Sequence, residues 1–206
     1  MRRPAFPTSD RRVRRTRKAL HDALAALIHE KSYRAIAVRE ILDRADVGRS
    51  TFYQHYGSKD ELLASGIREI MASAGDGCGT TAERILASTL RFLEHLEIHR
   101  RGGGIRVGPR GRAVLHEHLR RVLVESIAAE LARGEGQDGN AYPAAAADLR
   151  VRQLASTFVT VLDWWIETRA PLGPREVNEL FRTLATPALD AISRPGRPER
   201  AARALP

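Results

Sequence analysis

The sequence predicts an all-α protein, with three closely spaced helices near its N-terminus followed by a larger helical domain. Apolar residues recur every three or four positions along most of the chain, which is the period of a helix with one buried face. No segment alternates apolar and polar residues as a half-buried strand does. With 206 residues and 43% hydrophobic content, the chain is long and apolar enough to bury a core.

The first four predicted helices follow one another with very short connections. The first begins at Thr16 and places five apolar residues on one face: Leu20, Ala23, Leu24, Leu27 and Ile28. Two short helices follow at 38–45 and 49–56, separated only by Asp46-Val47-Gly48. Ser58 and Glu61 have the spacing of a capping box, which predicts a fourth helix from Lys59 to about Ala74.

Four more helices are predicted beyond this point, separated by glycine-rich stretches at 75–77, 101–111 and 134–143. They cover 81–99, about 114 to 134, 144–169, and a last helix that begins at Pro174 and contains Pro187. The helix at 144–169 is apolar on two faces, more than its own core requires. We therefore expect it to contact a second copy of the chain, although a helix enclosed entirely by its own domain has the same pattern.

The positive charge is concentrated at the two ends of the chain. Residues 1–18 contain eight Arg or Lys and one Asp, and residues 194–206 contain four Arg and one Glu. Since the total is +9, the residues between are close to neutral. A basic arm ahead of a folded domain is typical of proteins that bind nucleic-acid phosphates, but a solubilising tail has the same composition.

Several classes of protein are disfavoured. No apolar run approaches the roughly 20 residues of a membrane span, and the N-terminus lacks the apolar segment of a signal peptide. With Cys78 as the single cysteine, we expect a cytoplasmic protein and no internal disulfide. There is no H-E-x-x-H or G-x-S-x-G motif, and Gly102-Gly103-Gly104 lacks the Lys-Ser/Thr of a P-loop, so we expect neither an enzyme nor a cofactor.

Residues 36–62 have the features of a helix-turn-helix. A small apolar core is available from Val38, Ile41, Leu42, Val47 and Phe52. Asp46 tolerates the positive φ that the turn requires. Phe52 and Tyr56 can face inward while polar side chains face a DNA major groove. A three-helix packing unit without a DNA function is the alternative.

The segment Thr51-Phe52-Tyr53-Gln54-His55-Tyr56-Gly57-Ser58-Lys59-Asp60-Glu61-Leu62-Leu63 resembles the TetR family of regulators. The resemblance covers residues 16–63 closely and the remaining helices only in number and order. It implies phosphate contacts by Tyr53, His55 and Lys59. It also implies that base edges are contacted by Arg39, Arg49, Ser50, Thr51 and Gln54.

The sequence departs from the family pattern at three positions of the helix-turn-helix. Asp46 stands where glycine is usual, Gly48 where a serine-like cap is usual, and Ala37 where threonine or serine is common. We expect these departures to weaken local stability, because each removes a favourable turn or cap residue, without removing any contact residue.

The resemblance also implies a small-molecule effector and a homodimer. Candidate effector-binding residues are Phe92, His95, His116 and Trp164, each of which also fits plain core or surface. Candidate dimer residues are Phe158, Trp165, Val177, Leu180, Phe181 and Leu184. The pairs His95/His99 and His116/His118 make a metal site conceivable, but no third ligand accompanies them, and we expect none.

These observations predict four segments: a basic flexible arm at 1–15, a helix-turn-helix DNA-binding domain at 16–62, a helical ligand-binding and dimerisation domain at 63–193, and a disordered basic tail at 194–206. We expect a sequence-specific transcriptional regulator, a repressor that a small molecule releases from double-stranded operator DNA. The alternatives are a nonspecific architectural DNA-binding protein and a small helical enzyme. Footprints with and without sequence preference would distinguish the first two.

Overall fold

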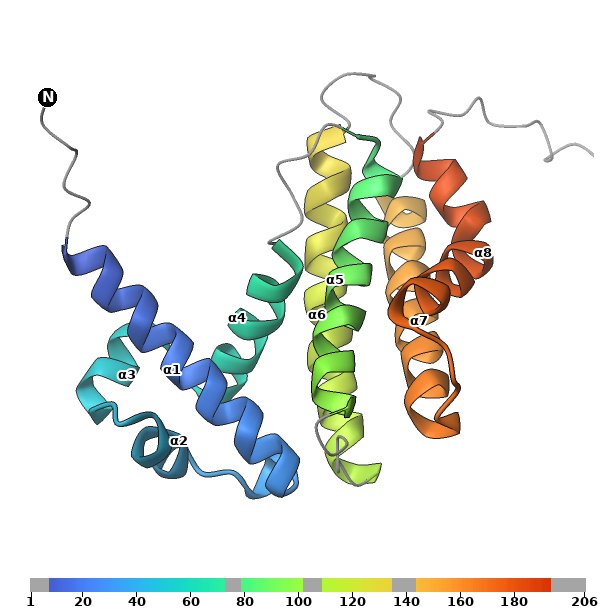
Figure 1. The fold of residues 1–206 in the computed structure, drawn as a ribbon. Coiled ribbons are helices and arrows are strands. Elements are labelled where there is room, and N and C mark those ends of the chain that lie inside the picture. Colours follow the sequence, from blue (N-terminus) through green and yellow to red (C-terminus); the bar gives the residue numbers. More distant parts are fainter. Residues whose placement is uncertain (1–7, 73–78, 102–108, 135–143, 194–206) are drawn as a thin grey trace, which may run out of the picture. The chain divides into compact units, whose positions relative to one another are not determined.

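The computed structural model describes residues 8–72, 79–101, 109–134 and 144–193. Over these ranges the chain is helical and contains no strand, which confirms the all-α prediction (Figure 1). In chain order the elements are α1 (Thr8–Glu30), the 3-10 turn η1 (Tyr33–Ala35), α2 (Val38–Ala45), α3 (Arg49–His55), α4 (Lys59–Ala72), α5 (Thr81–Arg101), α6 (Pro109–Gly134), α7 (Ala144–Thr168) and α8 (Pro174–Ser193).

Contacts within the chain divide it into two compact units. The first, which we call the head unit, comprises Met1–Ile70 and His95–Val122 and so contains α1, α2, α3 and nearly all of α4. The second, the body unit, comprises Met71–Glu94 and Leu123–Pro206 and contains α7 and α8. Helices α5 and α6 contribute residues to both. The head unit therefore extends beyond residue 62, the domain boundary predicted from the sequence.

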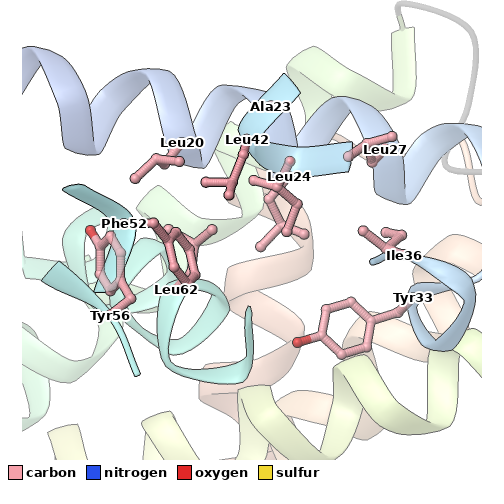
Figure 2. Close-up of a cluster of buried hydrophobic side chains, with 11 residues drawn as sticks. Leu20, Ala23, Leu24, Leu27, Tyr33, Ile36, Leu42, Phe52, Tyr56 and Leu62 are labelled. Carbon is pink, nitrogen blue, oxygen red and sulfur yellow. The ribbon is translucent and has the colours of Figure 1, made fainter. Parts of the chain in front are cut away.

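The head unit is organised around one apolar cluster, shown in Figure 2. Helix α1 contributes the stripe that its sequence spacing predicts, and α2, α3 and α4 pack on it. Its members are Leu20, Ala23, Leu24, Leu27, Tyr33, Ile36, Ile41, Leu42, Phe52, Tyr56 and Leu62. Phe52 has no exposed surface, and burying a side chain of this size contributes about 2–3 kcal/mol. Short helices such as α3 depend on such anchors because they are too short to be stable alone.

Helix α1 begins at Thr8 rather than at the predicted Thr16. The flexible arm expected at 1–15 is therefore wrong for residues 8–15, while residues 1–7 lie outside the described residues. The physical reason is that arginine is a strong helix former, and extending an established helix costs little once its first turns are packed. The predicted start was taken from the apolar stripe of the helix, and such a stripe marks only the buried turns. The arginines at 11, 12, 14 and 15 are exposed.

Helix α6 also begins earlier than predicted, at Pro109 rather than near Val114. Proline is favoured at the first helical position because its missing N–H would have no partner there. The connection predicted at 101–111 is shortened accordingly, since α5 continues to Arg101. What remains of it, residues 102–108, lies outside the described residues.

The body unit has an aromatic core between α5, α7 and α8. The rings of Phe92 and Phe158 lie 6.1 Å apart, and those of Phe158 and Phe181 lie 5.3 Å apart in an edge-to-face arrangement. Trp165 is fully buried and donates its indole N–H to the carbonyl of Leu172, at 2.9 Å. Helices α7 and α8 pack against each other along this core (Figure 1).

Candidate nucleic-acid interface

The turn between α2 and α3 is built as its sequence predicts. Asp46 has φ 52° and ψ 48°, in the left-handed region that ends helices. The amide of Val47 then donates to the carbonyl of Leu42, at 3.1 Å, which closes the end of α2. Only aspartate, asparagine and glycine adopt this conformation at modest cost, so the residue type and the turn agree.

The missing polar cap at Ala37 is partly compensated. The side chain of Glu40 accepts a hydrogen bond from the backbone N–H of Ala37, at 2.8 Å, which is one half of a capping box. Glu40 also forms an ion pair with Lys31, and both contacts lower the pKa of its carboxyl, the Lys31 hydrogen bond most. The start of α2 is thereby tied to the end of α1.

Helix α3 presents a polar face. Phe52 and Tyr56 are buried, as predicted, and this directs Arg49, Ser50 and Gln54 to solvent. Three of the predicted base-contacting residues are thus exposed on a single turn and a half of helix. Thr51, another of them, is half-buried and closer to the core.

Tyr53, which the resemblance assigns to phosphate contact, is 48% exposed and held from two sides. Its ring lies edge-on to Phe52, with centroids 5.2 Å apart, and the guanidinium of Arg49 lies 5.7 Å from its centre. These contacts orient the ring while leaving it accessible. His55 is half-buried beside Tyr56, with ring centroids 6.3 Å apart.

Arg39, on the exposed side of α2, faces solvent next to Asp43. Its Nε lies 3.7 Å from the carboxylate of Asp43, and their side chains are 89% and 71% exposed. An ion pair this exposed contributes less than about 1 kcal/mol, so Arg39 can exchange Asp43 for a nucleic acid at little cost.

Lys59 does not have the free ammonium that its predicted phosphate contact requires. Its Nζ donates to the backbone carbonyls of Tyr33 at 2.9 Å and Ile36 at 2.7 Å, and it lies 4.7 Å from the centre of the Tyr33 ring. The side chain therefore binds the carbonyl end of η1 and adds a charged donor to the Tyr33 carbonyl, which also accepts the N–H of Ile36. This arrangement links the start of α4 to η1, and sequence spacing could not indicate it because the partners are 23 and 26 residues away.

A second network, which the sequence analysis missed, fixes the end of α3 against α1 and α4. Arg17 donates to the hydroxyl of Tyr56 and to Ser65 Oγ, both at 3.1 Å. His21 Nε2 lies 3.3 Å from the same Tyr56 hydroxyl, and its Nδ1 lies 3.2 Å from Glu69. The only sequence signal was Tyr56 itself, a buried aromatic whose hydroxyl needs a partner.

Burial decides the charge state of His21. Desolvation lowers the pKa of His21, against the opposing attraction of Glu69. The hydrogen bond to Tyr56 raises the pKa of Arg17, so this guanidinium keeps its charge at the junction. A neutral imidazole and a cationic guanidinium therefore share the Tyr56 hydroxyl at the end of α3.

The predicted effector residues belong partly to the head unit and partly to the body unit. Phe92 is buried in the core of the body unit, while His95 and His116 are half-buried and belong to the head unit. Trp164 is 42% exposed on α7. Its neighbour Trp165 takes the buried position instead.

Four of the predicted dimer residues are core residues. Phe158, Trp165, Val177 and Phe181 have no exposed surface within the chain itself, so they cannot contact a partner directly. The prediction failed there because an apolar stripe on a helix does not reveal which partner buries it. Leu180 and Leu184 remain exposed, at 39% and 62%.

Other kinds of site find no support in the described part of the chain. Over residues 8–72, 79–101, 109–134 and 144–193, no three His, Cys, Asp or Glu side chains gather as metal ligands would. Within the same ranges, none of the helices has the length and apolar character needed to cross a membrane. Cys78 and His99 lie where the side chains are not described.

Comparison with known proteins agrees with the geometry of the head unit. Residues 20–65 match the family described as bacterial regulatory proteins, tetR family. The chain is 35% identical over 100 residues to YxbF, an HTH-type transcriptional regulator of Bacillus subtilis (strain 168), which is 43% of this chain and 26% of that protein. It is 39% identical over 54 residues to KstR, an HTH-type transcriptional repressor of Mycobacterium tuberculosis (strain H37Rv), which is 26% of this chain and 24% of that protein.

The two alignments thus span only about a quarter of each relative. Over 85% of this chain, the fold is similar to 95% of the crystal structure of a TetR-family regulator of Syntrophomonas wolfei, with a TM-score of 0.50 at 17% identity. The sequence motif, the helix-turn-helix geometry and the matched residues coincide in the same segment. Over residues 20–65, this chain is similar to the TetR family of bacterial regulatory proteins.

Proposed function

We propose that this protein is a transcriptional regulator that binds specific DNA sequences by inserting α3 into the major groove. The observation that carries the proposal is the division of α3 into a buried aromatic side and an exposed polar side, with Arg49, Ser50 and Gln54 outermost. A major groove admits one helix, arginine pairs with guanine O6 and N7, and glutamine pairs with adenine N6 and N7.

Phosphate contacts on either side of the groove would fix the register. Tyr53 and His55, on α3, would make these contacts, whereas Arg39, on the exposed side of α2, stays a candidate for contact with base edges. The ammonium of Lys59 is committed to backbone carbonyls, so in this proposal it positions α4 instead of binding phosphate.

We further propose that two copies bind together as a homodimer through α7 and α8, within the predicted domain 63–193. One half-site read by a single short helix is too weak alone, and twofold sites require a twofold protein. Exposed large apolar side chains support this location: Leu180 and Leu184 on α8, and Trp164 on α7. A monomer leaves these in water, whereas a dimer can bury them.

The direction of control is proposed to be repression, relieved by a small molecule. KstR, which carries the name repressor, is 39% identical to this chain over 54 residues. The TetR resemblance supports a small-molecule effector bound within the predicted domain 63–193, and the candidate residues there stay predictions.

Selection of binding sites from random duplex DNA, followed by footprinting, tests this function. The parent protein should select a palindrome whose half-sites lie about 34–36 Å apart. Arg49→Ala and Gln54→Ala should each weaken binding to that site by about 1–3 kcal/mol and relax the preference at one base pair. Arg182→Ala, on the exposed surface of α8, is the control and should bind as the parent does.

A protein that binds all sequences equally, with a steep salt dependence, would instead be the architectural alternative. Binding of the selected site by both α3 variants at parental affinity would show that another surface reads the bases. Either result would overturn the assignment of α3.

A further inference from the structure

The first turns of α1 carry positive charge that the rest of the described surface does not neutralise. Arg11, Arg12, Arg14 and Arg15 are all exposed, and no carboxylate among the described residues pairs with any of them. Some surface arginines elsewhere do have such a partner: Arg39, Arg44, Arg152 and Arg182 each pair with a carboxylate. Four neighbouring guanidiniums with no described carboxylate partner repel one another, and an anionic partner would relieve this repulsion.

This basic stretch is held at a fixed angle to α3. One turn further along α1, Arg17 donates to Tyr56 at the end of α3 and to Ser65 on α4. Figure 1 shows α3 beside the N-terminal half of α1. From this anchor the helix continues to Thr8, a length of about 14 Å at 1.5 Å per residue. The arginines of α1 therefore project from the same rigid unit as α3, the helix proposed to enter the major groove.

We propose that residues 8–18 of α1 are a second DNA-binding element, in which the four arginines bind backbone phosphates next to the groove that α3 reads. This rests on the proposed function and adds a rigid phosphate-binding surface to it. Arg11, Arg14 and Arg15 share one helix face at spacings of three and four, and Arg12 lies beside it. Duplex DNA is the partner that fits, because it presents about one charge per 1.7 Å along its axis and arginine binds phosphate bidentately.

A rigid helix and a flexible arm make different predictions. If only charge matters, disrupting the helix while keeping every arginine changes little, because a flexible chain can still reach the phosphates. If the helix positions the arginines, its disruption loses contacts although the charge is unchanged. Each phosphate contact contributes about 0.9 to the slope of log K against log salt concentration.

The experiment compares full-length variants on a mixed-sequence DNA duplex over a series of salt concentrations. In the first variant, Arg11, Arg12, Arg14 and Arg15 are all replaced by glutamine, which preserves helix propensity and removes charge. In the second, Val13→Pro interrupts the helix and keeps all the arginines. The matched control is Val13→Ala, and a glycine pair at Val13 and Thr16 repeats the interruption without proline.

We expect the glutamine variant to lose roughly 2–4 units of slope. Both helix-interrupted variants should lose part of that amount, and Val13→Ala should match the parent. An unchanged slope in the glutamine variant would overturn the phosphate contacts. A parental slope in the helix-interrupted variants would overturn the role of the helix and restore a flexible arm.

Failure of this inference is distinguishable from failure of the proposed function. A parent protein that selects a DNA sequence, and whose slope none of these variants alters, contradicts the second element alone. A parent that selects no sequence contradicts the function of α3, while a slope lowered by the glutamine and helix-interrupted variants would still support phosphate binding by α1.

Discussion

The imidazole of His118 on α6 packs edge-on against the ring of Tyr33 in η1, with ring centroids 5.7 Å apart. Arg121 donates to His118 Nδ1 at 2.7 Å, so the proton of the neutral ring resides on Nε2, 3.6 Å from Asp60. Asp60 in turn accepts a hydrogen bond from the Tyr33 hydroxyl, and both this bond and burial raise the pKa of Tyr33. A change in the position of α6 therefore reaches η1 and the start of α4 directly.

We expect the protein to lose stability as the pH falls below about 6.5. Burial lowers the pKa of both His118 and His21, so the unfolded chain binds protons that the folded chain does not. Stability then rises with pH through the window between the lowered pKa values and 6.5, and it is fully present above that window. Urea unfolding at about pH 7.5 and about pH 5.5 measures the difference.

Phenylalanine at either position keeps a ring but removes the titration. His118→Phe and His21→Phe should each reduce the loss of stability between the two pH values, relative to the parent. If both variants lose as much as the parent between about pH 7.5 and 5.5, other groups are responsible for the dependence.

Replacement of Lys59 should affect folding more than phosphate binding. Lys59→Met removes a charged donor from the carbonyls of Tyr33 and Ile36 and should cost about 2 kcal/mol of unfolding free energy. Lys18→Met is the control, because Lys18 pairs with Asp22 at the exposed surface and its replacement should cost less than about 1 kcal/mol. If Lys59→Met unfolds like the parent but lowers the slope of log K against log salt concentration by about 0.9, Lys59 binds a phosphate after all.

The exposed leucines of α8 and its buried phenylalanine should respond differently to charge. Leu184→Arg should give monomers in sedimentation with near-parental melting, since Leu184 is 62% exposed. Phe181→Glu should destabilise the body unit by about 4 kcal/mol or more, because it buries a carboxylate in a closed core. Arg182→Glu, which faces another side of α8, should remain dimeric. Dimers that persist in Leu184→Arg would exclude this face.

Position 46 provides a test of the turn. Asp46→Gly should be at least as stable as the parent in urea, because glycine adopts the left-handed conformation without steric cost. Asp46→Ala should be less stable by about 1 kcal/mol, since its Cβ meets the carbonyl that follows. Equal stability of the two variants would show that the turn relaxes to another conformation.

Local chemistry made the head predictable from sequence. The apolar stripe of α1, the inward positions of Phe52 and Tyr56 and the positive φ of Asp46 all follow from spacing and residue type, and each is present. The start of α1 was missed because an exposed arginine-rich helix carries no apolar period.

Contacts between distant segments were beyond the sequence. In the sequence, Lys59 is a cation at the start of a helix. Its hydrogen bond to the carbonyl of Ile36, at the end of η1, is visible only in the folded chain. The four buried dimer candidates failed for a related reason: Val177 and Phe181 belong to a stripe next to the one formed by Leu180 and Leu184. Hydrophobicity alone does not separate the two.

A buried polar contact sets the register of α8. Thr89 on α5 donates to Asn178 Oδ1 at 2.8 Å, and Asn178 Nδ2 donates to the carbonyl of Leu86 at 3.2 Å. Ridges of leucine and alanine can slide by one turn at little cost, whereas a displaced Asn178 would leave its amide without partners, at about 1–3 kcal/mol. Helix α8 is therefore held at one axial position on α5, and its outer surface has a single geometry against which another molecule can fit.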